Sequence, residues 1–317
     1  MNQLTVIIPF LNEGEEIRNT LQSIRETAGD LVDILLINDA SYDNFDYKSF
    51  AQEYHATYYQ NETRMGVARS RDIGVEKITT DCFLIVDGHM RFYHNNWCNV
   101  IIAAIKQNDR ALYCCKCRPL DQNTNYIEGK FSYGAYMEMY DKEDHYTLSP
   151  KWIRLDIHPD QNMMKIPCVL GASYAASKRY WTYLKGLNGL KMYGSDEPYI
   201  SLKVWLEGGD CILIKNIEIG HIFRDKFPYE VRDAETIFNK LLITETLLPS
   251  EDRDSVYNVL RKTEGMHLRD AMELLLDRMD EINELKSYYT KITTRSFESF
   301  IIFNDEVKEK IAAIQNT

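Results

Sequence analysis

The chain has 317 residues, of which 44% are hydrophobic, enough for one large α/β domain with a smaller appendage. Its formal net charge of -11 argues against a protein that holds nucleic acid by nonspecific attraction to the phosphate backbone, although local basic patches remain compatible with it. No apolar stretch reaches the length of a membrane span, and residues 6–11 are too short, and lack the basic flank, for a signal peptide.

Strands and short helices alternate along the first part of the chain. Residues 4–10 form an apolar run that stops at a proline, and residues 32–37 and 83–86 form further apolar runs that predict buried strands. Residues 15–28 are predicted as a helix because Ile17, Leu21 and Ile24 recur on one face, and a second helix is predicted to end near Lys77. This alternation indicates a mostly parallel sheet covered by helices on both faces.

Polar residues follow three of these predicted strands. Asn12 and Glu13 follow the first strand, Asp39 follows the second, and the triplet from Asp87 to His89 follows the run 83–86. Open α/β sheets bind ligands at the carboxyl ends of their strands, so these groups are expected to converge. Asp87 and His89, two residues apart, can turn to the same side and hold a divalent cation, which can in turn hold a diphosphate. Taken singly, each acid also fits an ordinary turn residue or helix cap.

Three arginines, Arg64, Arg69 and Arg71, lie around the start of the second predicted helix. Alone they fit a solvated helix face. Beside Asp39 and the proposed cation site, however, they supply the positive charge that a bound diphosphate requires.

Three later motifs add candidate groups. Gly171 lies in a stretch of small residues that would let the backbone approach a ligand closely. Asp196 and Glu197 precede a helix predicted over residues 199–207, where acids favour a helix N-terminus and can also act as a general base or bind an acceptor hydroxyl. His221, within the run from Gly220 to Arg224, is a candidate third ligand to the cation. Two histidines and one aspartate suit manganese better than magnesium.

Together these motifs resemble a known family. Residues 4–43 and 64–89 resemble the nucleotide-binding half of a family 2 glycosyltransferase with the GT-A fold. The later motifs are similar to those of the polypeptide N-acetylgalactosaminyltransferases and their bacterial relatives. Those enzymes have an Asp-x-His metal motif, a Gly-Gly-Glu-Asn stretch opening a helix that ends Val-Trp-x-x-Gly-Gly, and a Gly-His-Val-Phe-Arg segment. The matching segments here are residues 87–89, 194–197, 204–209 and 220–224, and the similarity covers roughly residues 3–225.

The resemblance implies a GT-A fold, Rossmann-like, with a glycosyltransferase domain over residues 1–225 and a helical C-terminal region over residues 226–317. The nucleotide-sugar half would end near residue 117 and the acceptor half would follow it. The implied activity is metal-dependent transfer of a sugar from a nucleotide-diphosphate donor, a UDP-sugar in the first instance, to an acceptor hydroxyl. A nucleotidyltransferase and a non-catalytic binding protein on the same fold are the alternatives.

The expected site contains three groups of residues. Asp87, His89 and His221 would bind Mn²⁺, with Mg²⁺ as the alternative metal. Asp196 and Glu197 would be the catalytic acids; because family 2 enzymes often carry Glu-Asp there, the reversed order leaves open which acid is the base. If one of these carboxylates acts as a general base, the reaction inverts the configuration of the transferred sugar, and we lean to this outcome. The N-acetylgalactosaminyltransferases, in contrast, retain that configuration. The donor-binding residues would be Pro9, Phe10, Asn12, Glu13, Asp39, Arg64, Gly66, Arg69, Asp87, Gly88, Gly171 and Arg224.

Fewer sequence features bear on the acceptor of the sugar and on the cellular location of the protein. The acceptor, whether a glycan, lipid-linked intermediate, protein or nucleic acid, cannot be chosen from the sequence. The seven cysteines, an odd number without a signal peptide, indicate reduced thiols, and Cys114, Cys115 and Cys117 are predicted as core residues of a strand. We expect a cytoplasmic protein, with the membrane periphery as the alternative, and no Golgi mucin-type enzyme, because no membrane anchor or lectin-like repeat is found.

Two long segments lie outside these motifs. Residues 118–165 have few helix or strand patterns and are predicted as an acceptor-facing insertion. Their aromatic and charged residues include Tyr126, Phe131, Tyr133, Tyr136, Tyr140, Asp141, Glu143, Asp144, His145 and Tyr146. In the helical tail, an apolar seam from Leu268 to Ile282 alternates spacings of four and three, which predicts helix packing within the chain or in a homodimer.

Overall fold

The computed structural model describes residues 2–140, 147–224 and 226–316, so the predictions for residues 141–146 lie outside the described residues. The first half of the chain contains β1 (Leu4–Phe10), α1 (Glu16–Ala28), β2 (Asp33–Asn38), α2 (Tyr47–Glu53), β3 (Thr57–Gln60), α3 (Val67–Lys77), β4 (Cys82–Val86), β5 (Met90–Phe92), α4 (Trp97–Gln107) and β6 (Ala111–Leu120). The rest contains β7 (Ala135–Glu138), β8 (Ser149–Trp152), β9 (Met163–Lys165), β10 (Ser173–Ser177), α5 (Lys178–Tyr183), α6 (Asp196–Glu207), β11 (Asp210–Ile222), α7 (Asp233–Leu247), α8 (Ser250–Thr263), α9 (Gly265–Leu276), α10 (Met279–Ile292) and α11 (Phe297–Gln315).

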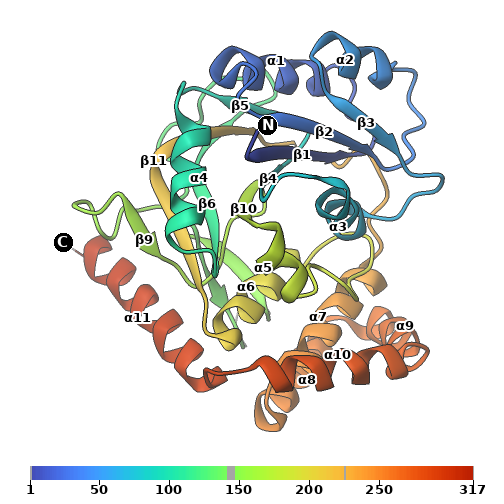
Figure 1. Cartoon of the computed structure of the whole chain (residues 1–317). Coiled ribbons are helices and arrows are strands. Elements are labelled where there is room, and N and C mark those ends of the chain that lie inside the picture. The colour runs from blue at the N-terminus through green and yellow to red at the C-terminus, as the bar shows by residue number, and fades with distance from the viewer. Residues whose placement is uncertain (1, 141–146, 225, 317) are drawn as a thin grey trace.

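The main sheet has the strand order β3-β2-β1-β4-β10-β6-β11-β5, with β9 paired to β11 (Figure 1). The first four strands in this order are parallel, as predicted. Strand β10 runs antiparallel to both of its neighbours, and β11 is parallel to β6 but antiparallel to β5 and β9. The α/β class with helices on both faces is confirmed, and the sheet is mixed beyond β4. The reversal of β10 places Ser173 opposite Val86, so the segment entering β10 lies beside the segment leaving β4.

The two faces of the sheet are covered by different helices, because alternate side chains of each strand point to opposite sides. Val6 and Ile8 of β1 pack in one cluster with α1, α2 and α4, whereas Ile7 packs in the other with α3, α5 and α6. In Figure 1, α1 and α2 lie above the sheet, and α3, α5 and α6 lie below it. Each face therefore has its own core, and the strand ends between them stay available for a site.

The helices of the C-terminal region continue the lower core. Ile237 and Phe238 of α7, and Leu275 and Ile282 of the predicted seam, belong to the same buried cluster as α3 and α6. Figure 1 shows α7 to α10 grouped below α6, with α11 extending from this group past β9. The seam is therefore used for packing within the chain.

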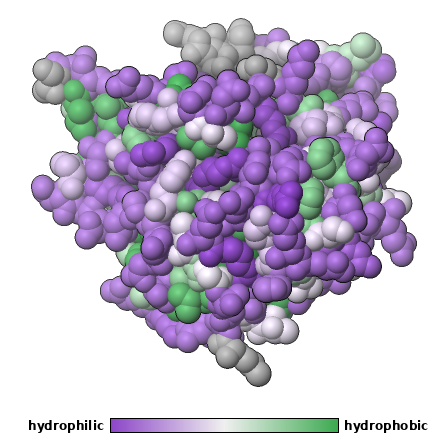
Figure 2. Space-filling view, turned by 90° about the horizontal axis from the view of Figure 1, so that it is seen from above, coloured by the Kyte–Doolittle hydropathy of each residue, from purple (hydrophilic) through white to green (hydrophobic). Residues whose placement is uncertain are grey.

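The cysteines, the surface and the helix lengths can each be compared with what the composition predicts. All seven cysteines are buried and free, in line with the prediction that Cys114, Cys115 and Cys117 are core residues of a strand. Figure 2, which views the face carrying α1 and α2, shows mainly hydrophilic residues with small separate apolar patches. Within the described ranges, no helix is long and apolar enough to cross a membrane.

Candidate active site

A cavity of about 320 Å³ opens where the first strands and β11 end. Of the residues predicted to bind donor, metal or acceptor, it is lined by Pro9, Phe10, Glu13, Asp39, Arg64, Gly66, Asp87, Gly88, His89, Gly171, Asp196, Glu197, His221 and Arg224. The structure thus brings together residues that lie more than half the chain apart in sequence. This convergence follows from the parallel order of β1, β2 and β4, because their carboxyl ends meet at one edge of the sheet.

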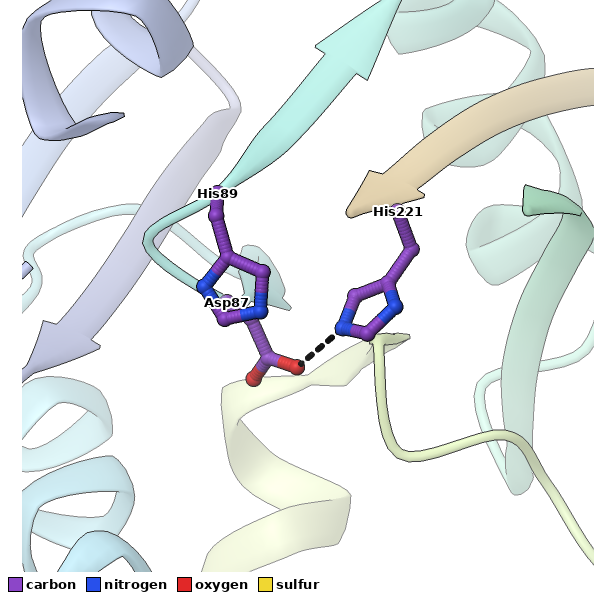
Figure 3. A group of neighbouring side chains, drawn as sticks. All are labelled: Asp87, His89 and His221. Atoms are coloured by element: carbon purple, nitrogen blue, oxygen red, sulfur yellow. Dashed lines mark ion pairs between the residues drawn. The ribbon is translucent and has the colours of Figure 1, made fainter. Parts of the chain in front are cut away.

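Asp87, His89 and His221 form the candidate metal centre. One ligand atom of each lies within 4.8 Å of the others, and the Nε2 atom of His221 is 3.3 Å from Oδ2 of Asp87. Figure 3 shows Asp87 and His89 on the segment between β4 and β5, facing His221 at the end of β11. Strand β5 pairs with β11 in a register that aligns Met90 with His221. This pairing is what holds the third predicted ligand next to the first two.

The surroundings of the two imidazoles fit a metal site. The Nδ1 atom of His89 lies 3.1 Å from Oε2 of Glu13, which leaves its Nε2 free to act as a ligand. A carboxylate on the far nitrogen of a metal-binding histidine fixes the ring and its tautomer. Arg224 in turn forms an ion pair with Glu13. The Nδ1 atom of His221 is buried and has no hydrogen-bond partner among the described residues.

The charge states of these groups also suit a cation. Burial alone would raise the pKa of Asp87, but the hydrogen bond with His221 and the charge of Arg71 outweigh it and hold that pKa well below its usual range. Burial lowers the pKa of His221, against the opposing effect of Asp87. An ionised carboxylate and neutral imidazoles are the forms that bind a metal ion.

Arg71 connects the candidate metal centre to the two predicted catalytic acids, a connection that the sequence analysis did not identify. Its buried guanidinium lies 3.2 Å from Oδ1 of Asp87 and 3.2 Å from the carbonyl oxygen of Gly171, and it forms a close ion pair with Asp196. A usable signal existed, because Arg71 falls three residues after Ala68 and four before Val75, both buried on the same face of α3. That spacing identifies an arginine that faces the core rather than solvent.

The two acids at the start of α6 have different environments. The carboxylate of Asp196 is buried, and it accepts hydrogen bonds from Arg71 and from the hydroxyl of Tyr174, the latter at 2.7 Å. Glu197 is only half-buried. A Cβ added at Gly171 would lie only 2.0 Å from Oε1 of Glu197, so the Glu197 carboxylate occupies the space that a larger residue at position 171 would need. Gly171 is therefore required for the placement of Glu197.

The proton affinity of Glu197 is raised by its surroundings. Burial, followed by the nearby charge of Asp196, raises the pKa of Glu197 to about 8. Arg71 forms its ion pair with Asp196, and its charge lowers the pKa of Glu197 by less than burial raises it. Of the two predicted catalytic acids, Glu197 is the one with both access to the cavity and raised basicity.

Asp39, one of the predicted donor-binding residues, lies in the cavity wall and already has hydrogen-bond partners. Its carboxylate accepts hydrogen bonds from the backbone amides of Met65 and Gly66, at 2.7 and 2.8 Å, and from the side chain of Asn61 at 2.7 Å. It therefore shapes the segment that carries Arg64. The guanidinium of Arg64 lies 5.1 Å from the centre of the Tyr229 ring and donates a hydrogen bond to the Glu230 carbonyl.

Two predicted donor-binding residues do not line this cavity. Asn12 bonds to the backbone instead, with its amide nitrogen 3.2 Å from the Pro228 carbonyl and its oxygen accepting from the Tyr42 amide. Arg69 pairs with Glu76 on the exposed side of α3 and lines a separate cavity. Arg69 points away because it is two positions from Arg71 on a helix, which places the two side chains on different faces.

Aromatic residues that the sequence analysis did not propose as site residues also line the cavity. They are Trp152, Tyr193, Phe223, Phe227 and Tyr229. Trp152 packs on Phe223 with ring centres 5.0 Å apart, and Tyr193 packs on Phe227 at 4.9 Å. Trp152 comes from the segment predicted to face the acceptor, so one residue of that segment does reach the cavity. The abundance of tyrosine gave no positional signal for the others.

Comparison with known proteins identifies the family. The pattern described as "Glycosyl transferase family 2" matches residues 5–165, about half of the chain and the part that holds the nucleotide-side residues of the cavity. The chain belongs to glycosyl transferase family 2. The resemblance seen in the motifs is thereby confirmed.

The relatives and the similar solved structures have low sequence identity to this chain. Polypeptide N-acetylgalactosaminyltransferase 10 of Rattus norvegicus is 26% identical over 273 residues, which cover 83% of this chain and 44% of that protein. The chain thus spans less than half the length of the curated relatives it matches. The crystal structure of GalNAc-T7 with UDP, GalNAc and Mn²⁺ has a TM-score of 0.77 at 20% identity, covering 97% of this chain and 58% of that one. Mannosyltransferase PcManGT from Pyrobaculum calidifontis, in complex with GDP-Man and Mn²⁺, has a TM-score of 0.53 at 14% identity, covering 99% and 86%.

Proposed function

We propose that this family 2 protein transfers a sugar from a nucleotide-diphosphate sugar, a UDP-sugar in the first instance, to an acceptor hydroxyl, with Mn²⁺ bound by Asp87, His89 and His221. The observation that carries the proposal is that these three residues and Glu197 meet at one cavity. The relatives named N-acetylgalactosaminyltransferases, and the solved neighbours that hold UDP or GDP-Man with Mn²⁺, support this choice of donor and metal.

The donor set supports manganese on chemical grounds. Two imidazoles, which are borderline ligands, combined with one carboxylate, which is a hard oxygen ligand, suit Mn²⁺, Fe²⁺ or Zn²⁺ better than Mg²⁺. Three protein ligands leave positions for phosphate oxygens, and Glu13 orients His89 from behind. When bound, the cation neutralises charge on the leaving diphosphate.

The chain's own groups then have distinct tasks. Arg64 and Arg224, which line the cavity, supply positive charge on the donor side. Arg71 holds Asp87 and Asp196 in fixed positions relative to each other. Glu197 accepts a hydrogen bond from the acceptor hydroxyl and, if it removes the proton, the reaction inverts the sugar. The aromatic pair Trp152 and Phe223 covers part of the cavity wall, which reduces access of water.

The test is release of UDP from a panel of UDP-sugars, together with GDP release from GDP-mannose, measured with Mn²⁺ and after treatment with EDTA. We expect slow hydrolysis of at least one UDP-sugar that depends on Mn²⁺ and stops on chelation. Consumption of a nucleoside triphosphate and a sugar phosphate would instead identify a nucleotidyltransferase. Tight binding of UDP without turnover of any sugar nucleotide would identify a binding protein.

A further inference from the structure

One side chain of the C-terminal region reaches into the segment before the catalytic helix. Asn239 of α7 is fully buried, and its side-chain oxygen accepts a hydrogen bond from the Lys191 amide at 2.8 Å. Its side-chain nitrogen lies 2.8 Å, 3.1 Å and 2.9 Å from the carbonyl oxygens of Lys191, Tyr193 and Gly194. A single amide thus bonds to four backbone groups of one short turn, defined here as residues 191–195, with its two N–H donors shared among the three carbonyls.

This turn has a backbone conformation that requires support. Met192 and Ser195 have φ angles of 37° and 65°, in the left-handed region that residues other than glycine rarely adopt. The turn also touches the donor side, because the Val67 amide donates to the Met192 carbonyl at 2.8 Å. Residues in such conformations persist when their surroundings hold them in place, and Asn239 supplies that support here.

The turn carries groups of the proposed reaction. Tyr193 lines the cavity, and Ser195 is followed directly by Asp196 and Glu197 in the first turn of α6. A shift of the turn would therefore move Glu197 relative to Gly171, against which its carboxylate packs. An error of about 1 Å in the placement of reacting groups can lower a rate on the order of a hundredfold.

We infer that Asn239 is a positioning residue for the acceptor side of the site, and that α7 is consequently part of the catalytic unit. This inference rests on the proposed function for the role of Glu197, but the hydrogen bonds of Asn239 to the turn can be tested without catalysis. Asn239 lies outside residues 5–165, the part of the chain that identifies the family. Asn239 acts through the turn and is not among the residues that line the cavity.

The chain offers a matched control in Asn304 of α11. Asn304 is equally buried, and its amide also bonds to backbone, accepting from the Met137 amide at 2.7 Å and donating to the Met137 carbonyl at 2.9 Å. Met137 lies in β7 and does not line the cavity. Both asparagines therefore hold backbone to a helix of the C-terminal region, but Asn239 alone of the two holds a segment of the site.

The variants are Asn239→Asp, Asn239→Ser, Asn304→Asp and Asn304→Ser. Aspartate keeps the acceptor for the Lys191 amide but cannot donate to the three carbonyls, and serine provides a milder loss should the first variant fold poorly. Hydrogen–deuterium exchange is followed in peptides covering the turn and β7. Turnover of the UDP-sugar that the wild type hydrolyses is measured with methyl glycosides as acceptor probes, giving a ratio of transfer to hydrolysis.

We expect Asn239 variants to exchange faster in the turn, and their ratio of transfer to hydrolysis to fall about tenfold to a hundredfold. Asn304 variants should exchange faster in β7 and keep the wild-type ratio. Unchanged exchange in the turn of the Asn239 variants, or equal loss of the ratio in both sets, would overturn the inference. If the wild type turns over no sugar nucleotide, the proposed function fails, and exchange in the turn still decides whether Asn239 holds it.

Discussion

At the scale of single residues, the site is a chain of paired charges beside one acid, Glu197, whose pKa is raised. Arg71 pairs with Asp87 and Asp196, Arg224 pairs with Glu13, and the imidazole of His89 lies beside Glu13. Burying a charge without a partner is costly, so these pairs explain why the pKa values of Asp87 and Glu13 are lowered although burial alone would raise them. Glu197 forms none of the ion pairs found among the described residues, and burial, followed by the nearby charge of Asp196, raises its pKa.

The two acids at the start of α6 should therefore respond differently to neutral substitution. Glu197→Gln should lower sugar transfer on the order of a hundredfold to ten-thousandfold if Glu197 is the base, with hydrolysis of the donor less affected. Asp196→Asn should cost about 3–5 kcal/mol of stability, because it breaks a buried pair and leaves Arg71 with one carboxylate fewer. Rates of transfer and urea unfolding curves measure both effects. Normal transfer by both variants would remove a carboxylate base and favour a retaining reaction, which analysis of the product anomer would establish.

The raised pKa of Glu197 predicts a pH dependence of folding in the metal-free protein. In the unfolded chain Glu197 loses its proton near pH 4.3, about the ordinary value for glutamate. In the folded protein it keeps the proton up to about pH 8. Between these pH values Glu197 is protonated in the folded state and ionised in the unfolded state. The contribution of Glu197 to the free energy of unfolding therefore falls as the pH rises from about 4.3 to about 8. Glu197→Gln should lack this decline.

Urea unfolding at several pH values, with EDTA present throughout, compares the wild type with Glu197→Gln. The difference in unfolding free energy between the two should change in favour of the variant as the pH rises. Parallel curves would show that Glu197 is not protonated in the folded protein at neutral pH.

At the scale of elements, α3 and α7 each connect the site to a distant part of the fold. Helix α3 brings Arg71 beneath Asp87 while its opposite side presents Arg69 to solvent. Helix α7 bonds to the turn before α6 through Asn239 and packs with α9 and α10 in the lower core. The seam from Leu268 to Ile282 is the part of this packing that a repeating apolar pattern could predict.

Substitution within the seam should destabilise the chain without changing its assembly. Leu275 is 3% exposed, whereas its neighbour Leu276 is 64% exposed. Leu275→Ser should cost at least about 2–5 kcal/mol, the range for truncating a buried leucine, because it adds a buried hydroxyl to the lost packing. Leu276→Ser should have an effect within about 0.5 kcal/mol.

Thermal melts and light scattering of both variants are the measurements. A lower molecular mass for Leu276→Ser would indicate that the outer side of α9 forms a homodimer contact. An unchanged melting temperature for Leu275→Ser would contradict the internal packing of the seam.

At the scale of the whole molecule, the candidate metal centre joins two separate strands of the main sheet. Asp87 follows β4, in the middle of the strand order, and His221 lies in β11, next to the edge strand β5, with β10 and β6 between β4 and β11. A cation held by residues of both strands would be bound by the folded state alone. Its binding therefore adds to global stability by linkage.

Manganese should raise the melting temperature of the wild type, and His221→Ala should remove most of that increase. A concentration a hundredfold above the dissociation constant adds about 2.7 kcal/mol at 25 °C. Differential scanning calorimetry with and without Mn²⁺, and after EDTA, measures the shift. His94→Ala, at an exposed histidine outside the cavity, is the matched control and should respond to Mn²⁺ as the wild type does. Equal shifts in the wild type and His221→Ala would exclude His221 as a ligand.

The sequence by itself determined the elements with strong periodicity and the groups at their ends. The apolar runs before Asp39 and Asp87 specified buried strands, and strands of one parallel sheet end at one edge, so their polar residues had to meet. Spacing alone paired Asp87 with His89. The helix start specified Asp196 and Glu197, because acids are favoured there for local reasons.

The tertiary structure alone decided how these groups differ from one another. Arg71 and Arg69 are both arginines of one helix, and only the packing of α3 shows that the first is buried against Asp87 and the second exposed. Asp196 and Glu197 are adjacent in sequence, and only the position of Arg71 and the gap at Gly171 separate a paired acid from a basic one. The contact of Asn239 with the turn before α6 links positions that no local pattern connects. Local propensity acts through neighbours in sequence, whereas charge state and placement depend on neighbours in space.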